Sequence, residues 1–150
     1  MIYKIELFQI GHLTNFVFRD EDIYSLKYMD DYEDHIIIFL KKNLTFTLSY
    51  QNKTIFIVSF NKLWPGVFEI WGVVNKQYLY NYFSIFRYAR YILNDFVKNF
   101  NVHRLQCQVR KEFYKSHRMM KFLDFKKEAV LYNYGPFKET YIQYSRLIYG

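Results

Sequence analysis

Seven short segments of the chain are predicted to be β-strands, and in four of them apolar and polar side chains alternate, as is typical of half-buried strands. In the fifth segment, Leu105 and Cys107 alternate with Gln106 and Gln108, so the two pairs are expected on opposite faces of a sheet. A two-residue connection at 51–52 predicts a tight hairpin between the second and third strands. The pattern as a whole predicts strands over residues 2–10, 44–50, 53–60, 67–74, 102–110, 129–134 and 140–147.

Apolar residues at three- and four-residue spacing predict a long helix over about residues 78–100. Shorter helices are expected from Asp20, over 32–42, and over about 113–122. Because the long helix joins strand 67–74 to strand 102–110, these two strands should be parallel, with a right-handed crossover. The order predicts an α/β (α+β) fold, in which a mixed, mostly antiparallel sheet with a central parallel β–α–β crossover has helices on both faces.

Length and composition indicate one domain over residues 1–150. The chain has 150 residues, 51% of them hydrophobic, with only five glycines and two prolines, so disorder is excluded and no linker is predicted. No apolar run approaches the roughly 18 residues of a membrane span, and residues 1–10 are too short and too charged for a signal peptide. We therefore expect a soluble intracellular protein or a component of a particle, with no membrane partner.

Charge is uneven along the chain. Residues 1–40 carry three basic and eight acidic side chains, a balance of −5, whereas residues 87–127 carry eleven basic and three acidic ones, a balance of +8. The basic segment could attract a phosphorylated cofactor, a nucleic acid or an acidic protein, or it could form a solvated helix face. Nucleic acid is not favoured, because no binding motif accompanies the basic residues.

Two segments of the second half resemble the ribosomal-protein N-terminal acetyltransferases of the GNAT superfamily. They are HRLQCQV at 103–109 and FLDFKKEAVL at 122–131, and Ser116 and Arg118 match the small polar and basic positions of the helix between them. LWPGVFEIW at 63–71 and YGPFKETYIQYSRL at 134–147 are similar to small GNAT-like proteins encoded by tailed phages. The resemblance covers about residues 60–150 and implies a single GNAT-like domain.

The resemblance implies an acetyl-CoA-dependent N-acetyltransferase that acts on a primary amine of a protein or small molecule. It implies that the N–H groups of Gly72, Val73 and Val74 lie near the pantetheine and the acetyl carbonyl, with Trp71 beside them. It also implies that the gap into which acetyl-CoA fits opens where strands 67–74 and 102–110 diverge.

The remaining candidate site residues are polar. Glu69 is the one acid between residues 35 and 94 and is a candidate general base, although it could equally be solvent-facing or ion-paired. Tyr114 is a candidate general acid for the leaving thiolate. Lys76, Arg87 and Ser116 are candidate contacts of the cofactor, and for Arg87 the alternative is an exposed helix face.

Three positions depart from the GNAT pattern. GNAT enzymes carry a Q/R-x-x-G-x-G/A loop whose N–H groups bind the coenzyme A pyrophosphate, but residues 73–83 read VVNKQYLYNYF, without glycine. Phe113 replaces a common asparagine, and Asp124 stands at a glycine position that often needs a positive φ. An alternative is therefore a catalytically degenerate GNAT-like structural or interaction protein, such as a phage virion component with protein partners in the particle. We expect the chain in the host-cell cytoplasm or in the phage virion.

No metal site is predicted. The single cysteine, Cys107, lies in an alternating strand and is expected to be buried. His12, His35 and His117 show no ligand spacing relative to one another.

Overall fold

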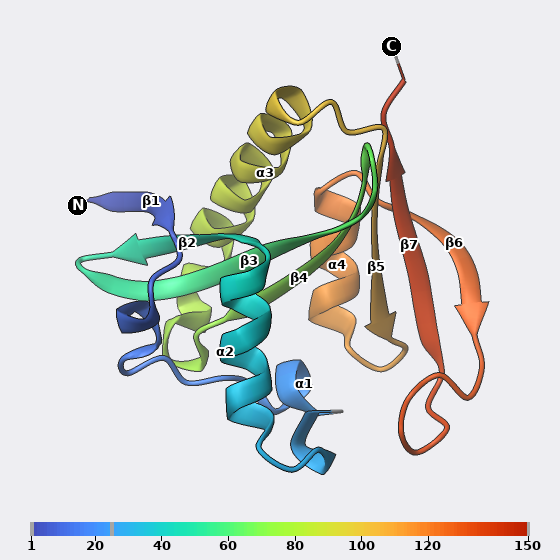
Figure 1. Ribbon diagram of the computed structural model, residues 1–150, viewed down its shortest axis with the longest axis horizontal. Coiled ribbons are helices and arrows are strands. Elements are labelled where there is room, and N and C mark those ends of the chain that lie inside the picture. The colour runs from blue at the N-terminus through green and yellow to red at the C-terminus, as the bar shows by residue number, and fades with distance from the viewer. Residues whose placement is uncertain (1, 25, 150) are drawn as a thin grey trace. The chain divides into compact units, whose positions relative to one another are not determined.

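The computed structural model describes residues 2–24 and 26–149 and contains one seven-stranded sheet (Figure 1). The strands are β1 (Tyr3–Leu7), β2 (Leu44–Tyr50), β3 (Lys53–Trp64), β4 (Val67–Val74), β5 (Arg104–Arg110), β6 (Lys126–Leu131) and β7 (Tyr141–Leu147). The α-helices are α1 (Asp20–Ile23), α2 (Tyr32–Lys42), α3 (Tyr82–Asn99) and α4 (Tyr114–Phe122), and 3-10 turns are η1 (Ile10–Leu13), η2 (Leu26–Tyr28) and η3 (Lys76–Asn81).

The sheet has the order β1-β2-β3-β4-β5-β7-β6. β4 and β5 are parallel, whereas β1–β2, β2–β3, β5–β7 and β6–β7 are antiparallel. This arrangement confirms the predicted mixed, mostly antiparallel sheet with a central parallel crossover. The parallel ladder joins Val67–Glu69 to Arg104–Gln106, three residue pairs at the beginning of the two strands. A ladder of this length agrees with the expectation that the two strands pair over only part of their length.

The chain divides into two compact units. The first comprises Met1–Asn61 and Trp71–Tyr88, and the second comprises Lys62–Ile70 and Ala89–Gly150. That they act together as one domain over residues 1–150 stays a prediction.

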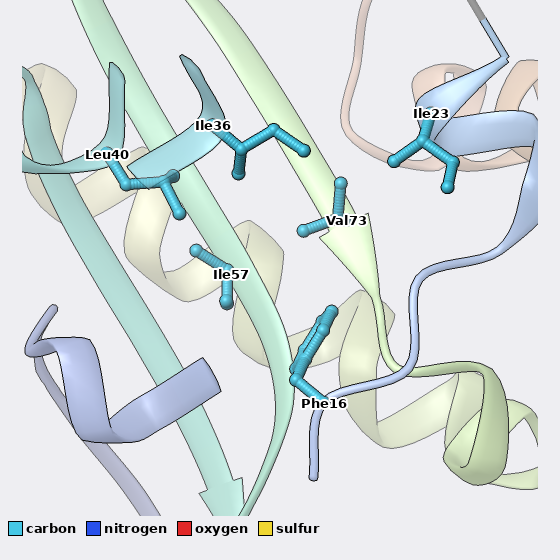
Figure 2. Packing of buried hydrophobic residues seen from close by; sticks show 6 residues of the cluster. All are labelled: Phe16, Ile23, Ile36, Leu40, Ile57 and Val73. Atoms are coloured by element: carbon cyan, nitrogen blue, oxygen red, sulfur yellow. The ribbon is translucent and has the colours of Figure 1, made fainter. Parts of the chain in front are cut away.

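The core of the first unit forms where α2 covers one face of β3 and β4. Its side chains point toward one another from four elements and the segment before α1 (Figure 2). The helix contributes Ile36 and Leu40 at four-residue spacing, so one stripe of α2 is buried. The cluster consists of Phe16, Ile23, Ile36, Leu40, Ile57 and Val73. The first part of α3 lies on the opposite face of these strands, so helices cover both faces within this unit (Figures 1 and 2).

The core of the second unit follows from the alternation in β5, whose burial is strictly periodic. Leu105, Cys107 and Val109 are buried, and Phe68 of β4 packs edge-to-face on Phe96 of α3 with ring centroids 4.9 Å apart. The opposite face of β5 is polar. The burial of Cys107 confirms its predicted place in the sheet.

Boundaries differ from the prediction where a turn or a partner strand decides them. β1 ends at Leu7, before the turn η1, and β5 begins at Arg104. The prediction for the sixth strand, 129–134, was wrong by about three residues: it covers Lys126–Leu131, because antiparallel pairing with β7 begins at Lys126. The predicted long helix begins as the 3-10 turn η3, with a kink at Tyr78, before α3 proper.

No helix in the described part of the chain is long and apolar enough to cross a membrane. Over residues 2–24 and 26–149, no three His, Cys, Asp or Glu side chains gather in a group that could hold a metal ion.

Candidate functional site

Glu69 lies within a network of neutral amide side chains on the polar face of the second unit. Its Oε1 accepts a hydrogen bond from Gln108 Nε2 at 2.7 Å and a longer one from Gln106 Nε2 at 3.4 Å. Gln108 Nε2 also donates to Gln143 Oε1 at 2.8 Å. Glu69 of β4, Gln106 and Gln108 of β5 and Gln143 of β7 share this face because side chains alternate along each strand. We call these four residues the glutamine network.

No cation neutralises Glu69, since none of the ion pairs among the described residues includes its carboxylate. Burial raises the pKa of Tyr134, and the negative charge of Glu69 raises it further. The Tyr134 phenol therefore lies within the electrostatic field of this carboxylate. Glu69 is half-buried and held through Oε1, so the carboxylate is oriented while Oε2 has no protein hydrogen-bond partner in the described chain. Such a group can accept a proton or bind an ammonium ion.

Tyr114 and Ser116 lie in the first turn of α4, as the sequence predicted. Tyr114 is 75% exposed and Ser116 is half-buried. Phe113 is the N-cap residue of α4 and provides no side-chain cap. Within the described residues, no hydrogen bond links Tyr114 or Ser116 to Glu69.

The expected contacts of the acyl donor lie at the end of β4. Val74 is buried there, and its role stays a prediction. Gly72 is exposed, and a Cβ atom there would lie 3.4 Å from Phe56 Cε2, in ordinary to tight contact. Val73 is buried in the core of the first unit, and Trp71 packs edge-to-face on Phe39 at 5.7 Å.

The turn after β4 is organised by the side chain of Asn75, which is only 2% exposed. Asn75 Oδ1 accepts from Gln77 N at 3.1 Å and Val17 N at 3.4 Å, and its Nδ2 donates to Thr54 O at 3.0 Å. The Asn75 N–H donates to Ile55 O at 2.9 Å. Asn75 thus caps the helical segment and ties three parts of the first unit together.

The basic side chains near the expected cofactor site differ in their acidic neighbours, and Arg87 has no ion-pair partner among the described residues. Lys76 lies close enough to Asp20 to help lower the pKa of that carboxyl, whose main partner is Lys27. Arg87 is exposed, in line with the alternative of a solvated helix face. Arg90, in the second unit, binds Asp124 with an Nη2–Oδ2 distance of 3.0 Å.

A polar pocket of about 230 Å³ in the first unit borders the same turn. Its lining contains one cation, Lys53, and no carboxylate among the described residues. The pocket is bordered by Thr14, Asn15, Lys53, Thr54, Asn75, Gln77 and Tyr78. Asn75 is therefore part of its wall as well as the cap of the turn.

The sequence analysis did not identify the residues that orient Glu69 or organise the turn after β4. The glutamines of β5 lie on its polar face, which alternation predicted, but their hydrogen bonds to Glu69 depend on the register of three strands. Asn75 follows directly on β4 and precedes a helical pattern, which is an N-cap signal that could have identified it. His117 was considered only as a metal ligand.

His117 instead anchors α4 to the sheet. Its Nε2 lies 3.0 Å from the carbonyl oxygens of both Arg110 and Lys111, so Nε2 carries the hydrogen. Its Nδ1 therefore accepts from the hydroxyl of Tyr144 at 2.6 Å. These bonds fix the helix turn that carries Tyr114.

Comparison with solved structures defines the fold. The acetyltransferase (GNAT family) from Bacillus anthracis is 21% identical, with 98% of this chain and 95% of that chain covered and a TM-score of 0.76. The ribosomal-protein-S18-alanine N-acetyltransferase from Escherichia coli is 14% identical over 99% of this chain and 97% of that chain, with a TM-score of 0.71. The ribosomal-protein-S5-alanine acetyltransferase from Vibrio fischeri is 14% identical over 97% and 92%, with a TM-score of 0.69. In comparisons of sequence, no family model and no curated protein matches.

The chain therefore has the GNAT fold, the fold of N-acetyltransferases that include ribosomal-protein alanine acetyltransferases. The resemblance seen in residues 60–150 is confirmed at the level of the fold, and the likeness extends over nearly the whole chain. The likeness to phage-encoded proteins stays a prediction.

Proposed function

We propose that the chain is an acetyl-CoA-dependent N-acetyltransferase that acts on a primary amine of a protein or small molecule. The GNAT fold makes this class of reaction the first to consider, but a fold alone does not establish a function. The observation that carries the proposal is Glu69, a carboxylate oriented by neutral amides and unpaired with any cation in the described chain.

In the proposed reaction, the amine nitrogen attacks the thioester carbonyl carbon. The new N–C bond forms, the C–S bond breaks, and the amine transfers a proton to Glu69. Tyr114 is proposed to supply a proton to the departing thiolate. Trp71, Gly72, Val73 and Val74 are proposed beside the donor. Lys76, Arg87 and Ser116 are proposed as further polar contacts.

The amide donors of Gln106 and Gln108 have a defined part in this proposal. Neutral donors hold the carboxylate in one orientation without supplying the full positive charge that would make it a poor base. An arginine at the same place would form an ion pair and strongly favour the ionised carboxylate. The network therefore holds the carboxylate in one orientation without an ion pair among the described residues.

The experiment is an acetyl-transfer assay with purified protein. Acetyl-CoA is supplied with a panel of amines, comprising peptides with a free N-terminus, lysine-containing peptides and small polyamines. Product is identified by a mass increase of one acetyl group, and thiol release is followed independently. Failure to form an acetylated product with every amine in the panel would refute the proposal.

The Glu69→Gln variant tests the assignment of the base. It preserves shape and can still accept the hydrogen bond from Gln108, but it cannot take a proton, so kcat should fall by about 10²–10⁴. Glu33→Gln is the matched control, since Glu33 is an exposed residue of α2, and it should keep the wild-type rate. A Glu69→Gln variant as active as the control would remove Glu69 from the mechanism.

A second candidate function is that of a catalytically degenerate GNAT-like interaction protein, such as a phage virion component. Large exposed aromatic side chains favour it, because aromatic residues are enriched at protein contacts. Trp64 is 70% exposed, Tyr132 78% and Tyr149 86%. Recovery of the chain as a fixed component of purified particles, together with no acetyl transfer, would select this candidate.

A further inference from the structure

Four consecutive N–H groups, from the residue after β4 into the first helical turn, have acceptors inside the first unit. The Asn75 N–H donates to Ile55 O at 2.9 Å. The next three are Lys76 N to Val17 O at 2.8 Å, Gln77 N to Asn75 Oδ1 at 3.1 Å, and Tyr78 N to Asn75 O at 2.9 Å. We call residues 75–78 the capped turn.

The first N–H groups of a helical segment have no intrahelical acceptor, and for that reason they can bind the oxygens of a phosphate. In the capped turn, this capacity is already used. A phosphate could reach Gln77 N or Tyr78 N only by displacing Asn75, whose side chain is almost fully buried. Displacement would leave Thr54 O and the Asn75 amide without partners in a buried place, which is costly.

The buried cation of the segment before α1, Arg19, is already paired. Its partner is Asp22 of α1, whose side chain is 8% exposed. Arg19 binds that carboxylate through two hydrogen bonds, Nε–Oδ2 at 2.9 Å and Nη2–Oδ1 at 2.8 Å. The guanidinium is therefore already paired, and its Nη1 also donates to Tyr82 Oη at 3.2 Å.

We propose that the chain recognises its acyl donor through the pantetheine thioester arm, and that the pyrophosphate and nucleotide of coenzyme A add little to recognition. This inference rests on the proposed function. The substrate class is then an acyl-pantetheine thioester, with or without the nucleotide. The transfer itself is unchanged: the acyl carbon exchanges its bond to sulfur for a bond to nitrogen, and the pantetheine leaves as a thiol once it has gained a proton.

The inference is tested with three acyl donors: S-acetylpantetheine, S-acetyl-4′-phosphopantetheine and acetyl-CoA. They share the acetyl-pantetheine arm and differ only in the group attached to its far end. With one amine acceptor, kcat/KM for the three should agree within about tenfold. A turn with three vacant N–H groups would form charge-assisted hydrogen bonds to the pyrophosphate, and these would favour acetyl-CoA by roughly 1,000-fold or more. A preference for acetyl-CoA above about tenfold therefore overturns the inference.

The outcomes separate the two proposals. Transfer from acetyl-CoA alone would overturn the donor inference and leave the acetyltransferase proposal intact. No transfer from any of the three donors would overturn both.

A second readout does not depend on turnover. The backbone amide signals of residues 75–78, followed by NMR, should respond equally to acetyl-CoA and S-acetylpantetheine. Large shifts or new exchange protection at Gln77 and Tyr78 with acetyl-CoA alone would show that the turn opens to hold the pyrophosphate, and would overturn the inference. Adenosine 3′,5′-bisphosphate, which lacks the thioester arm, should not displace acetyl-CoA, and effective displacement would count against the inference.

Discussion

Replacement of Asn75 by alanine should destabilise the protein more than any exposed asparagine substitution. The side chain is 2% exposed and makes two well-formed hydrogen bonds, from Gln77 N at 3.1 Å and to Thr54 O at 3.0 Å. Alanine would leave that N–H and that carbonyl unsatisfied, at about 1–3 kcal/mol each. The bond from Val17 N at 3.4 Å is too long to add much. We therefore expect a loss of about 3 kcal/mol in the free energy of unfolding.

Urea and thermal unfolding followed by circular dichroism would measure this loss. For a chain of this size, about 3 kcal/mol corresponds to a decrease in Tm of about 6–12 °C. Asn75→Asp keeps the oxygen acceptor but removes the donor to Thr54, so it should lose less than Asn75→Ala. Asn99→Ala, at the exposed end of α3, is the matched control and should change stability by less than about 0.5 kcal/mol. If Asn75→Ala loses less than about 1 kcal/mol, the turn after β4 does not depend on the Asn75 cap.

Three further predictions concern the second unit. Hydrogen bonds from Arg104 hold the pKa of Glu128 at about 2, below its ordinary value of 4.5. The stabilisation that they give is therefore present above about pH 4.5 and is lost as the pH falls toward 2. Acid unfolding curves of wild type and Glu128→Gln should converge over that range, and parallel curves would contradict the assignment. Burial raises the pKa of the Cys107 thiol, so iodoacetamide should label it only in denaturant, and mass spectrometry showing full labelling of the folded chain would refute this. Asp124→Gly should raise the free energy of unfolding by about 0.5–1 kcal/mol. The φ of Asp124 is 65°, which glycine adopts without the cost that a side chain incurs, and the exposed ion pair with Arg90 that is lost contributes little. A variant that is less stable than wild type in thermal unfolding would contradict this reasoning.

Local patterns identified most of the elements. The bounds of β2, β4 and α2 agree with the predicted ranges, because alternation and helical spacing are strong in these segments. The two-residue hairpin at Gln51-Asn52 is confirmed, with φ of 48° and 62°. The positive φ expected at Asp124 is confirmed too, since the glycine pattern of the resembling segment marks a backbone conformation.

The sequence alone thus determined the order of elements, the two faces of the strand that became β5, and the parallel crossover. These features depend on the period of apolar side chains, which is local to each segment. The start of β6 at Lys126 was decided by its pairing with β7, a partner strand farther along the chain that no local pattern contains.

Only the tertiary structure decided which polar groups meet. Glu69 and Gln108 are far apart in sequence, and their hydrogen bond depends on the register of β4 against β5. In the same way, the absence of glycine in residues 73–83 indicated that the turn after β4 is unusual. It did not indicate that Asn75 already accepts hydrogen bonds from the N–H groups of Gln77 and Tyr78. Hydrogen-bond partners are set by positions in space, and one sequence without its fold does not specify them.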